Sequence, residues 1–448
     1  MSRRDFARIA AALLGFTLLL NLVWILYCGD GLSPMDPYSE AGVVRAGERF
    51  AREGFLENFG LPDVTYGDRF PGEGMTGPSG SRPSDPIYHG YPPGSEWLGG
   101  LYSRWFGAGR VALFRVFPVA FALLASATFL AGLTWAVGRS QACWVYLACL
   151  LTPMFTAMSH VLHYQGYALS LLLIELAILM NLLSPSGPGR ARAGTLAALF
   201  LLGFLQGYLC YDYCFVTTFA AVPIALLIVP DDRAIPWKSI LALCVAAGLG
   251  FVMAHGLHFT QSLLYFGDLR SALEEYAFRS KKEYAARSLL EGRSTIEGIL
   301  IGVRYYARAY LRWNQLFGVA GEVLVAGLIW VLVVSQATFG AGRWQFQATM
   351  TRPRARELAG LAAALAIGLG WLFVKRYHAL NHLNYIGRHL FLFHLSGCLI
   401  VARAIAIHPR APIPSVAAPV SRAGVDRDSS ESQEKSAHGH QSKPKVLV

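Results

Sequence analysis

The feature that most constrains this chain is a succession of apolar segments long enough to cross a lipid bilayer. Of its 448 residues, 54% are hydrophobic and 15% are charged, which excludes an ordinary soluble domain. About 20 consecutive apolar residues indicate a membrane helix, because backbone groups cannot be left unpaired in hydrocarbon. The candidate segments are 7–27, 110–137, 142–159, 163–183, 194–211, 213–229, 238–258, 316–338, 357–375 and 389–407. We therefore predict an all-α polytopic membrane protein with about ten transmembrane helices, roughly nine to eleven.

Basic residues in the short connections predict the orientation of these helices. Lys and Arg accumulate on the cytoplasmic side of membrane proteins. They lie before or at the very start of the first segment, as Arg3, Arg4 and Arg8, and recur in alternate short connections. We expect a cytoplasmic amino terminus, a multi-pass domain over 1–407 in the plasma (inner) membrane, and a disordered cytoplasmic tail over 408–448.

Two connections are long, and both are predicted to be extracytoplasmic. The first spans 28–109 and the second 259–316. In the first, Asp36 followed by Pro37 is typical of a helix start. Residues 38–55 then place apolar and charged side chains at the spacing of an amphipathic helix on the membrane surface. The second loop interleaves basic and aromatic residues, and we expect one or two amphipathic helices there.

Charge and cysteine content argue against two other classes of protein. The net charge is +11, but much of the excess reflects membrane insertion and lipid contact, so we predict no nucleic-acid partner. Six of the seven cysteines lie in apolar segments and Cys28 ends the first one, so no cysteine pair lies in the external loops. No Cys/His spacing indicates a zinc site. We expect no required cofactor; a divalent metal is compatible with the sequence but is not predicted.

Several features of residues 7–110 follow one another in a distinctive order. They are a first membrane helix, an external Asp36 just beyond it, an amphipathic helix ending near Gly54, and a returning Tyr-Pro-Pro-Gly stretch. This order resembles the GT-C glycosyltransferases, polytopic enzymes that use polyprenyl-phosphate sugars, and especially the bacterial relatives of protein O-mannosyltransferases and aminoarabinose transferases. Many of these have Asp-Glu where this chain has Asp36 and Pro37. The resemblance implies a GT-C-like fold and sugar transfer at the outer face of the membrane.

Asp36 is the predicted catalytic residue. Transfer from a lipid-phosphate sugar needs a base that takes the proton of the acceptor hydroxyl as it attacks the anomeric carbon. One carboxylate suffices, because phosphate is already a good leaving group and needs cations more than an acid. The arrangement corresponds to inverting glycosidase chemistry. A helix-capping role, worth about 1 kcal/mol, is the alternative and is compatible with the first.

The remaining candidates are predicted to bind the donor or the acceptor. Basic residues just outside the membrane would meet the leaving phosphate, and Asp212, between two apolar segments, would contact sugar hydroxyls. The set comprises Glu40, Tyr88, His89, Tyr91, Asp212, Arg270, Arg304, Arg308, Arg312, His382 and Arg388. The alternatives are aromatic packing for the tyrosines and a solvated face for the arginines. Several histidines share the predicted external face, with interfacial bonding as their alternative role: His160, His163, His255, His258, His378, His382 and His389.

Two other functions remain open from the sequence. An O-antigen ligase or polymerase tends to carry its main basic loop late in the chain and does not need an early Asp loop. A transporter or a non-catalytic member of the fold is the other possibility, although transporters typically show inverted repeats with broken helices, and no matched pair of interrupted segments is evident. The expected donor is a polyprenyl-phosphate-linked sugar; the sugar and the acceptor (lipid, glycan or protein) are not readable.

Overall fold

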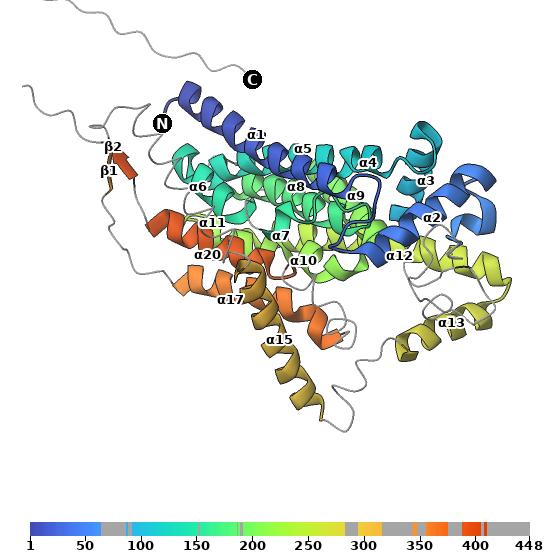
Figure 1. The fold of residues 1–448 in the computed structure, drawn as a ribbon. Helices are drawn as coiled ribbons and strands as arrows, with labels where there is room; N and C mark the ends of the chain where they lie inside the picture. The colour runs from blue at the N-terminus through green and yellow to red at the C-terminus, as the bar shows by residue number, and fades with distance from the viewer. Residues whose placement is uncertain are drawn as a thin grey trace, which may run out of the picture.

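The computed structural model describes residues 1–63, 87, 92–150, 153–185, 187–188, 191–282, 294–315, 344–346, 355–374, 388–404 and 407–409. Over this part of the chain the protein is nearly all helical (Figure 1). The exception is a short antiparallel ribbon of β1 (Trp344–Phe346) and β2 (Ile407–Pro409). Strand β2 includes the first two residues of the predicted tail, and the rest of the tail lies outside the described residues.

Five helices in the described ranges are long and apolar enough to cross a membrane. They are α1 (Arg3–Cys28), the pair α4 (Val111–Phe114) and α5 (Val116–Val137), α8 (Gln165–Leu183), α12 (Trp237–Phe266) and α17 (Ala355–Val374). Two shorter apolar helices, α9 (Ala193–Leu209) and α20 (Phe391–Ala404), accompany them. These helices are consistent with a multi-pass membrane protein. The count of about ten spans stays a prediction, and segment 316–338 lies outside the described residues.

Two predicted spans are not single helices. Segment 142–159 contains α6 (Arg139–Leu150) and α7 (Pro153–Thr156), and segment 213–229 contains α10 (Cys214–Phe219) and α11 (Ala221–Ile228). Pro223 accounts for the break between α10 and α11, because proline has no N–H to donate to the carbonyl four residues earlier. That carbonyl belongs to Phe219.

The apolar core lies where α5, α6, α8, α11 and α20 meet. Small residues bring some of the helices into backbone contact, as is usual between membrane helices. Between α9 and α12, for example, a Cβ atom on Gly250 would lie 2.0 Å from the Phe200 carbonyl oxygen. Figure 1 shows α1 along one side of this bundle and α17 with α20 on the other.

The first long loop folds into α2 (Pro37–Glu53), the short 3-10 helix η1 (Glu57–Gly60) and α3 (Gly94–Phe106). Helix α2 begins as predicted, with Asp36 as its N-cap and Pro37 in its first turn, and it ends at Gly54. Its expected position on the membrane surface stays a prediction, but α2 is not an exposed helix. Residues 40–47 are all buried, because α2 packs against α3 and the rest of the protein.

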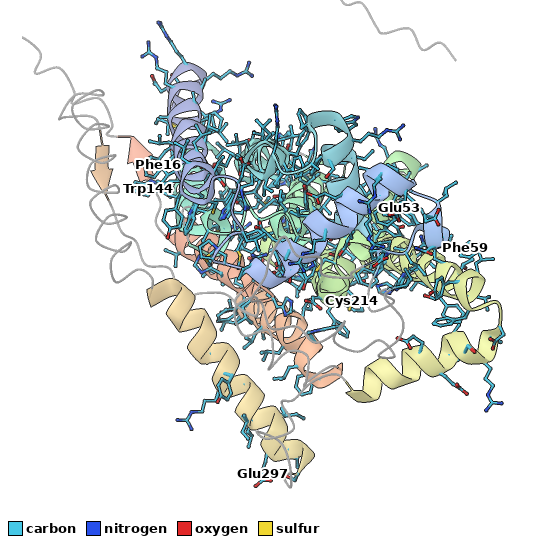
Figure 2. The ribbon with its side chains drawn as sticks, turned by 45° about the vertical axis from the view of Figure 1, so that its right-hand side comes forward. Phe16, Glu53, Phe59, Trp144, Cys214 and Glu297 are labelled. Carbon is cyan, nitrogen blue, oxygen red and sulfur yellow. The ribbon has the colours of Figure 1, made fainter. Side chains whose placement is uncertain are left out.

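In the described part of the second long loop there are two helices, where one or two were expected. Helix α12 continues to Phe266, beyond the predicted end of its span, and is followed by α13 (Leu269–Lys282) and α15 (Thr295–Gln315). Both lie at the periphery of the molecule in Figures 1 and 2. In Figure 2, Glu297 in the first turn of α15 is remote from Phe16 of α1.

Candidate functional site

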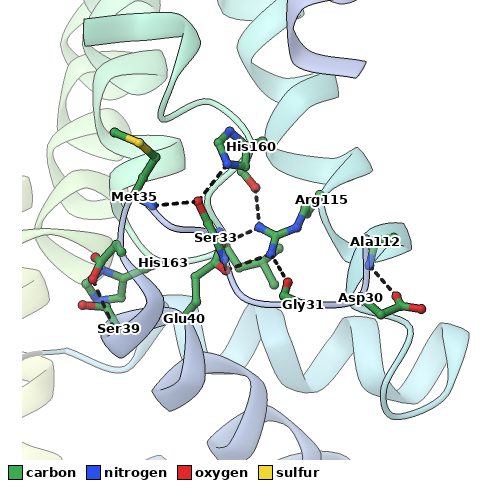
Figure 3. A network of polar contacts seen from close by, with 12 residues as sticks. Asp30, Gly31, Ser33, Met35, Ser39, Glu40, Ala112, Arg115, His160 and His163 are labelled. Atoms are coloured by element: carbon green, nitrogen blue, oxygen red, sulfur yellow. Dashed lines mark hydrogen bonds and ion pairs between the residues drawn. The ribbon is translucent and has the colours of Figure 1, made fainter. Parts of the chain in front are cut away.

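A buried arginine between α4 and α5 fixes the first loop (Figure 3). Arg115 is fully buried. Its Nη1 donates to Glu40 Oε1 at 2.5 Å and to the His160 carbonyl at 3.2 Å. Its Nη2 donates to Glu40 Oε2 at 2.9 Å and to the Gly31 carbonyl at 2.7 Å. One side chain therefore joins α2, the chain before α2 and the connection 157–164.

Glu40 completes this network with both of its carboxylate oxygens. Besides Arg115, its Oε1 accepts the Leu162 N–H at 2.9 Å and its Oε2 accepts the Ser33 N–H at 2.7 Å. A carboxylate has about four acceptor positions, and protein donors occupy them here. The predicted substrate contact of Glu40 stays a prediction, and these protein donors leave little acceptor capacity for it. Its role is to neutralise Arg115, since a buried charge is tolerated when it is paired and hydrogen-bonded.

His160 supports the same loop from the side of α1. Its Nε2 lies 2.9 Å from Ser33 Oγ, and its ring stacks on Trp24 with 5.0 Å between centroids. Burial, with a smaller contribution from the charge of Arg115, lowers the pKa of His160 to about 3. The imidazole is therefore neutral at physiological pH and acts as a fixed hydrogen-bonding group.

Asp36 lies at the start of α2, beside a histidine of the neighbouring connection. Its side chain is 5% exposed. Its Oδ1 accepts the Ser39 N–H at 3.2 Å, which confirms the capping role, and its Oδ2 lies 3.5 Å from His163 Nδ1. A carboxylate held by a cap and an imidazole is oriented as a general base requires. Its catalytic role stays a prediction.

Three consecutive residues before and at the start of α8 connect this acid to two other candidates. His163 contacts the acid, and Tyr164 donates its hydroxyl to Asp212 Oδ2 at 3.0 Å. Gln165 accepts from Arg388 Nη1 through its carbonyl at 2.8 Å and its Oε1 at 2.5 Å. The fold thus brings together candidates from the first loop, from the turn after α9 and from the turn before α20.

The guanidinium of Arg388 is buried and incompletely hydrogen-bonded. It is 2% exposed, yet its Nε and Nη2 make no hydrogen bond of good geometry within the described part of the chain. Tyr213 lies beside it, and its hydroxyl interacts with this guanidinium. Leaving buried guanidinium N–H groups unpaired is costly. An anion such as phosphate, which arginine binds in a bidentate manner, would satisfy them.

Glu96, in the first turn of α3, is a second buried acid near His163. Its Oε2 accepts the Ser95 hydroxyl at 3.1 Å. Burial raises the pKa of Glu96, and the charge of His163 opposes the rise. Glu96 is not a candidate from the sequence, because one acid before an apolar stretch is ordinary. Arg115 is not one either, although a charge inside a predicted span is energetically costly and can therefore indicate a site.

Two of the other predicted residues, Arg270 and Arg304, lie on peripheral helices and are not joined to this site in the described structure. Arg270 is 88% exposed on α13 and pairs with Glu274 one turn later at 2.8 Å. Arg304 is exposed on α15. Arg308 and Arg312 belong to the same helix, and their side chains lie outside the description, as do all of Tyr88, His89, Tyr91 and His382.

Comparison of the chain with protein-family models, with curated proteins and with solved structures finds no significant match. The fold and the site together define a nearly all-helical chain with membrane-length apolar helices and a buried polar site. The chemistry of that site must therefore be argued from its own residues.

Proposed function

We propose that this chain is a membrane glycosyltransferase. It would transfer a sugar from a polyprenyl-phosphate donor to an acceptor hydroxyl, with inversion, at the outer face of the plasma (inner) membrane. The observation that carries the proposal is the connection of a buried Asp36 to a buried Arg388 through residues 163–165. A base and a phosphate-binding cation are the two groups that this reaction needs.

Asp36 is the base in this mechanism. The acceptor oxygen forms a bond to the anomeric carbon and passes its proton to Asp36, while the bond from that carbon to the phosphate oxygen breaks. The polyprenyl phosphate leaves with the bonding electrons. His163, 3.5 Å from Asp36, orients the carboxylate. The raised pKa of Glu96 favours its neutral form, which limits repulsion of the phosphate.

Arg388 is the best-supported partner of the leaving phosphate. It is buried, whereas Arg270 is exposed and already paired with Glu274. In a buried site a charge-assisted hydrogen bond is stronger than it is in water. Asp212, held by Tyr164, is the candidate for contact with the sugar hydroxyls.

The decisive experiment for the base is the substitution Asp36→Asn. Asparagine caps a helix about as well as aspartate, so the protein should fold normally but lose turnover. The assay is the release of polyprenyl phosphate from lipid-linked hexose or aminoarabinose donors by purified protein in nanodiscs. The matched control is Asp30→Asn, since exposed Asp30 also accepts a backbone N–H, that of Ala112 at 2.8 Å. Near-normal turnover in Asp36→Asn would leave only the capping role.

A second experiment tests which arginine contacts the leaving phosphate of the donor. Arg388→Lys should lower turnover at saturating donor by about 10²–10³, the usual effect of losing one oxyanion donor. Arg270→Lys is the control and should retain activity within about threefold. The reverse result would move the leaving group to the second loop. Release of polyprenyl diphosphate instead of monophosphate would favour the ligase or polymerase alternative.

A further inference from the structure

Outside the polar site, α6 and α20 bring three metal-ligating side chains together. They are Cys149 in the last turn of α6, and His394 and Cys398 of α20. One donor atom from each lies within 4.8 Å of the other two. His394 Nε2 is 3.8 Å from Cys398 Sγ, and Cys149 is buried.

Sequence spacing and packing explain why these groups meet. His394 and Cys398 are four residues apart, so they share one face of α20. Helix α6 ends at Leu150, shortly before Pro153, which places Cys149 at its carboxyl-terminal end. Leu395 and Leu399 of α20 belong to the same apolar core as Cys149. The cluster therefore lies in surroundings of low polarity.

We propose that Cys149, His394 and Cys398 bind one thiophilic metal ion, zinc(II) or copper(I). Thiolate and imidazole are the ligands that both ions prefer. Zinc bonds of about 2.3 Å to sulfur and about 2.0–2.1 Å to nitrogen place neighbouring tetrahedral ligands roughly 3.5 Å apart, close to the separation of His394 from Cys398. Two thiolates also neutralise a zinc ion, which lowers the cost of burying it. Three ligands, in turn, suit trigonal copper(I).

The hydrogen bond of His394 predicts how binding proceeds. Its Nε2 lies 2.9 Å from the Ala148 carbonyl, which is one of the last four carbonyls of α6. A metal ion requires the Nε2 lone pair, so binding exchanges this hydrogen bond for a metal bond and moves the imidazole proton to Nδ1. Each thiol releases a proton to water, so the affinity should fall at low pH.

The test is metal binding by the purified, reduced full-length chain in nanodiscs. Zinc binding is measured in competition with a chromophoric chelator, with cobalt(II) as a spectroscopic probe of thiolate ligation, and copper(I) binding by anaerobic competition with bicinchoninate. We expect one ion per chain. Cys149→Ser and Cys398→Ser should weaken binding at least about tenfold, whereas Cys143→Ser and Cys244→Ser, which remove buried thiols outside the cluster, should not.

Each outcome decides the proposal. Tight binding of either ion that the Cys149 and Cys398 variants lose supports it and identifies the metal. Binding of neither ion, or binding that is unchanged in both variants, overturns it and leaves His394 as a cap of α6. A disulfide between the two cysteines in the protein as isolated, detected by thiol titration and mass, also overturns it. Thermal melting without added metal checks that each variant is folded.

Discussion

At the scale of single residues, hydrogen bonding distinguishes buried charged side chains that stabilise the fold from those that could bind a ligand. Both carboxylate oxygens of Glu40 accept hydrogen bonds, from Arg115 and from two backbone N–H groups. Arg388 keeps two nitrogens without a well-formed hydrogen bond in the described structure. Because an unmet buried donor is costly, the second pattern supports the proposed phosphate contact, whereas the first offers no comparable support.

His160 should make the free energy of unfolding depend on pH. The unfolded chain protonates this histidine near its ordinary pKa of 6.5, but the folded protein does so only near 3. The unfolded state therefore binds more protons in this window, and the free energy of unfolding should fall as the pH drops from 6.5 towards 3. The slope is at most about 1.4 kcal/mol per pH unit.

The measurement is the melting temperature of purified protein between pH 7 and pH 4.5. His160→Gln should flatten the profile, because glutamine does not titrate there. Ser33→Ala is the control: it removes the hydrogen bond to His160 but retains the titrating ring. A profile that is equally steep in His160→Gln would assign the effect to other groups.

At the scale of elements, the position of α2 depends on two contacts: the Arg115 network at its start and close backbone packing on α3 further along. A Cβ atom on Gly47 would lie 2.5 Å from the Gly99 carbonyl carbon. No heavy atom lies within 4 Å of the corresponding position on Gly42. The same helix thus contains one glycine without room for a Cβ atom, Gly47, and one with room for it, Gly42.

Gly47→Ala should therefore destabilise the protein by about 1–3 kcal/mol, the usual cost of overpacking. Gly42→Ala should be neutral or stabilise it by roughly 0.5–1 kcal/mol, because alanine is the better helix former. Melting temperatures in detergent compare the two. Equal effects of the two substitutions would show that α2 and α3 are not in backbone contact.

Loss of one partner of the buried ion pair should cost more. Glu40→Gln leaves the fully buried Arg115 without a counter-charge, and breaking a buried pair in this way typically costs about 3–5 kcal/mol. The exposed Glu57 is the control, and Glu57→Gln should change stability by less than about 0.5 kcal/mol. Chemical denaturation of the purified protein is the assay. A Glu40→Gln protein as stable as the control would mean that Arg115 finds another partner.

At the scale of the whole molecule, membrane-length helices are present, and the sidedness predicted from the basic residues can be tested. In a cysteine-free background, Ser2→Cys reports on the amino terminus and Leu56→Cys, 84% exposed in the unmutated chain, reports on the first loop. We expect a membrane-impermeant thiol reagent to label position 56 in intact cells and position 2 only after lysis. Labelling of both in intact cells would contradict the predicted topology.

Properties of contiguous stretches were predictable from the sequence. Apolar segments, the start of α2 at Asp36-Pro37 and its end at Gly54 follow from hydropathy and capping, which depend on neighbouring residues. The two helices of the second loop were predictable for the same reason. So was the selection of Asp36, Asp212 and Arg388 as charges worth explaining.

The tertiary structure alone decided which of these groups meet. The burial of α2 depends on α3, the saturation of Glu40 on Arg115, and the link from Asp36 to Arg388 on residues 163–165. Such contacts join groups distant in sequence, as His394 and Ala148 are, 246 residues apart. No local sequence pattern predicts them. A buried charge or donor needs a hydrogen-bond partner, and that partner comes from a segment that is distant in the sequence.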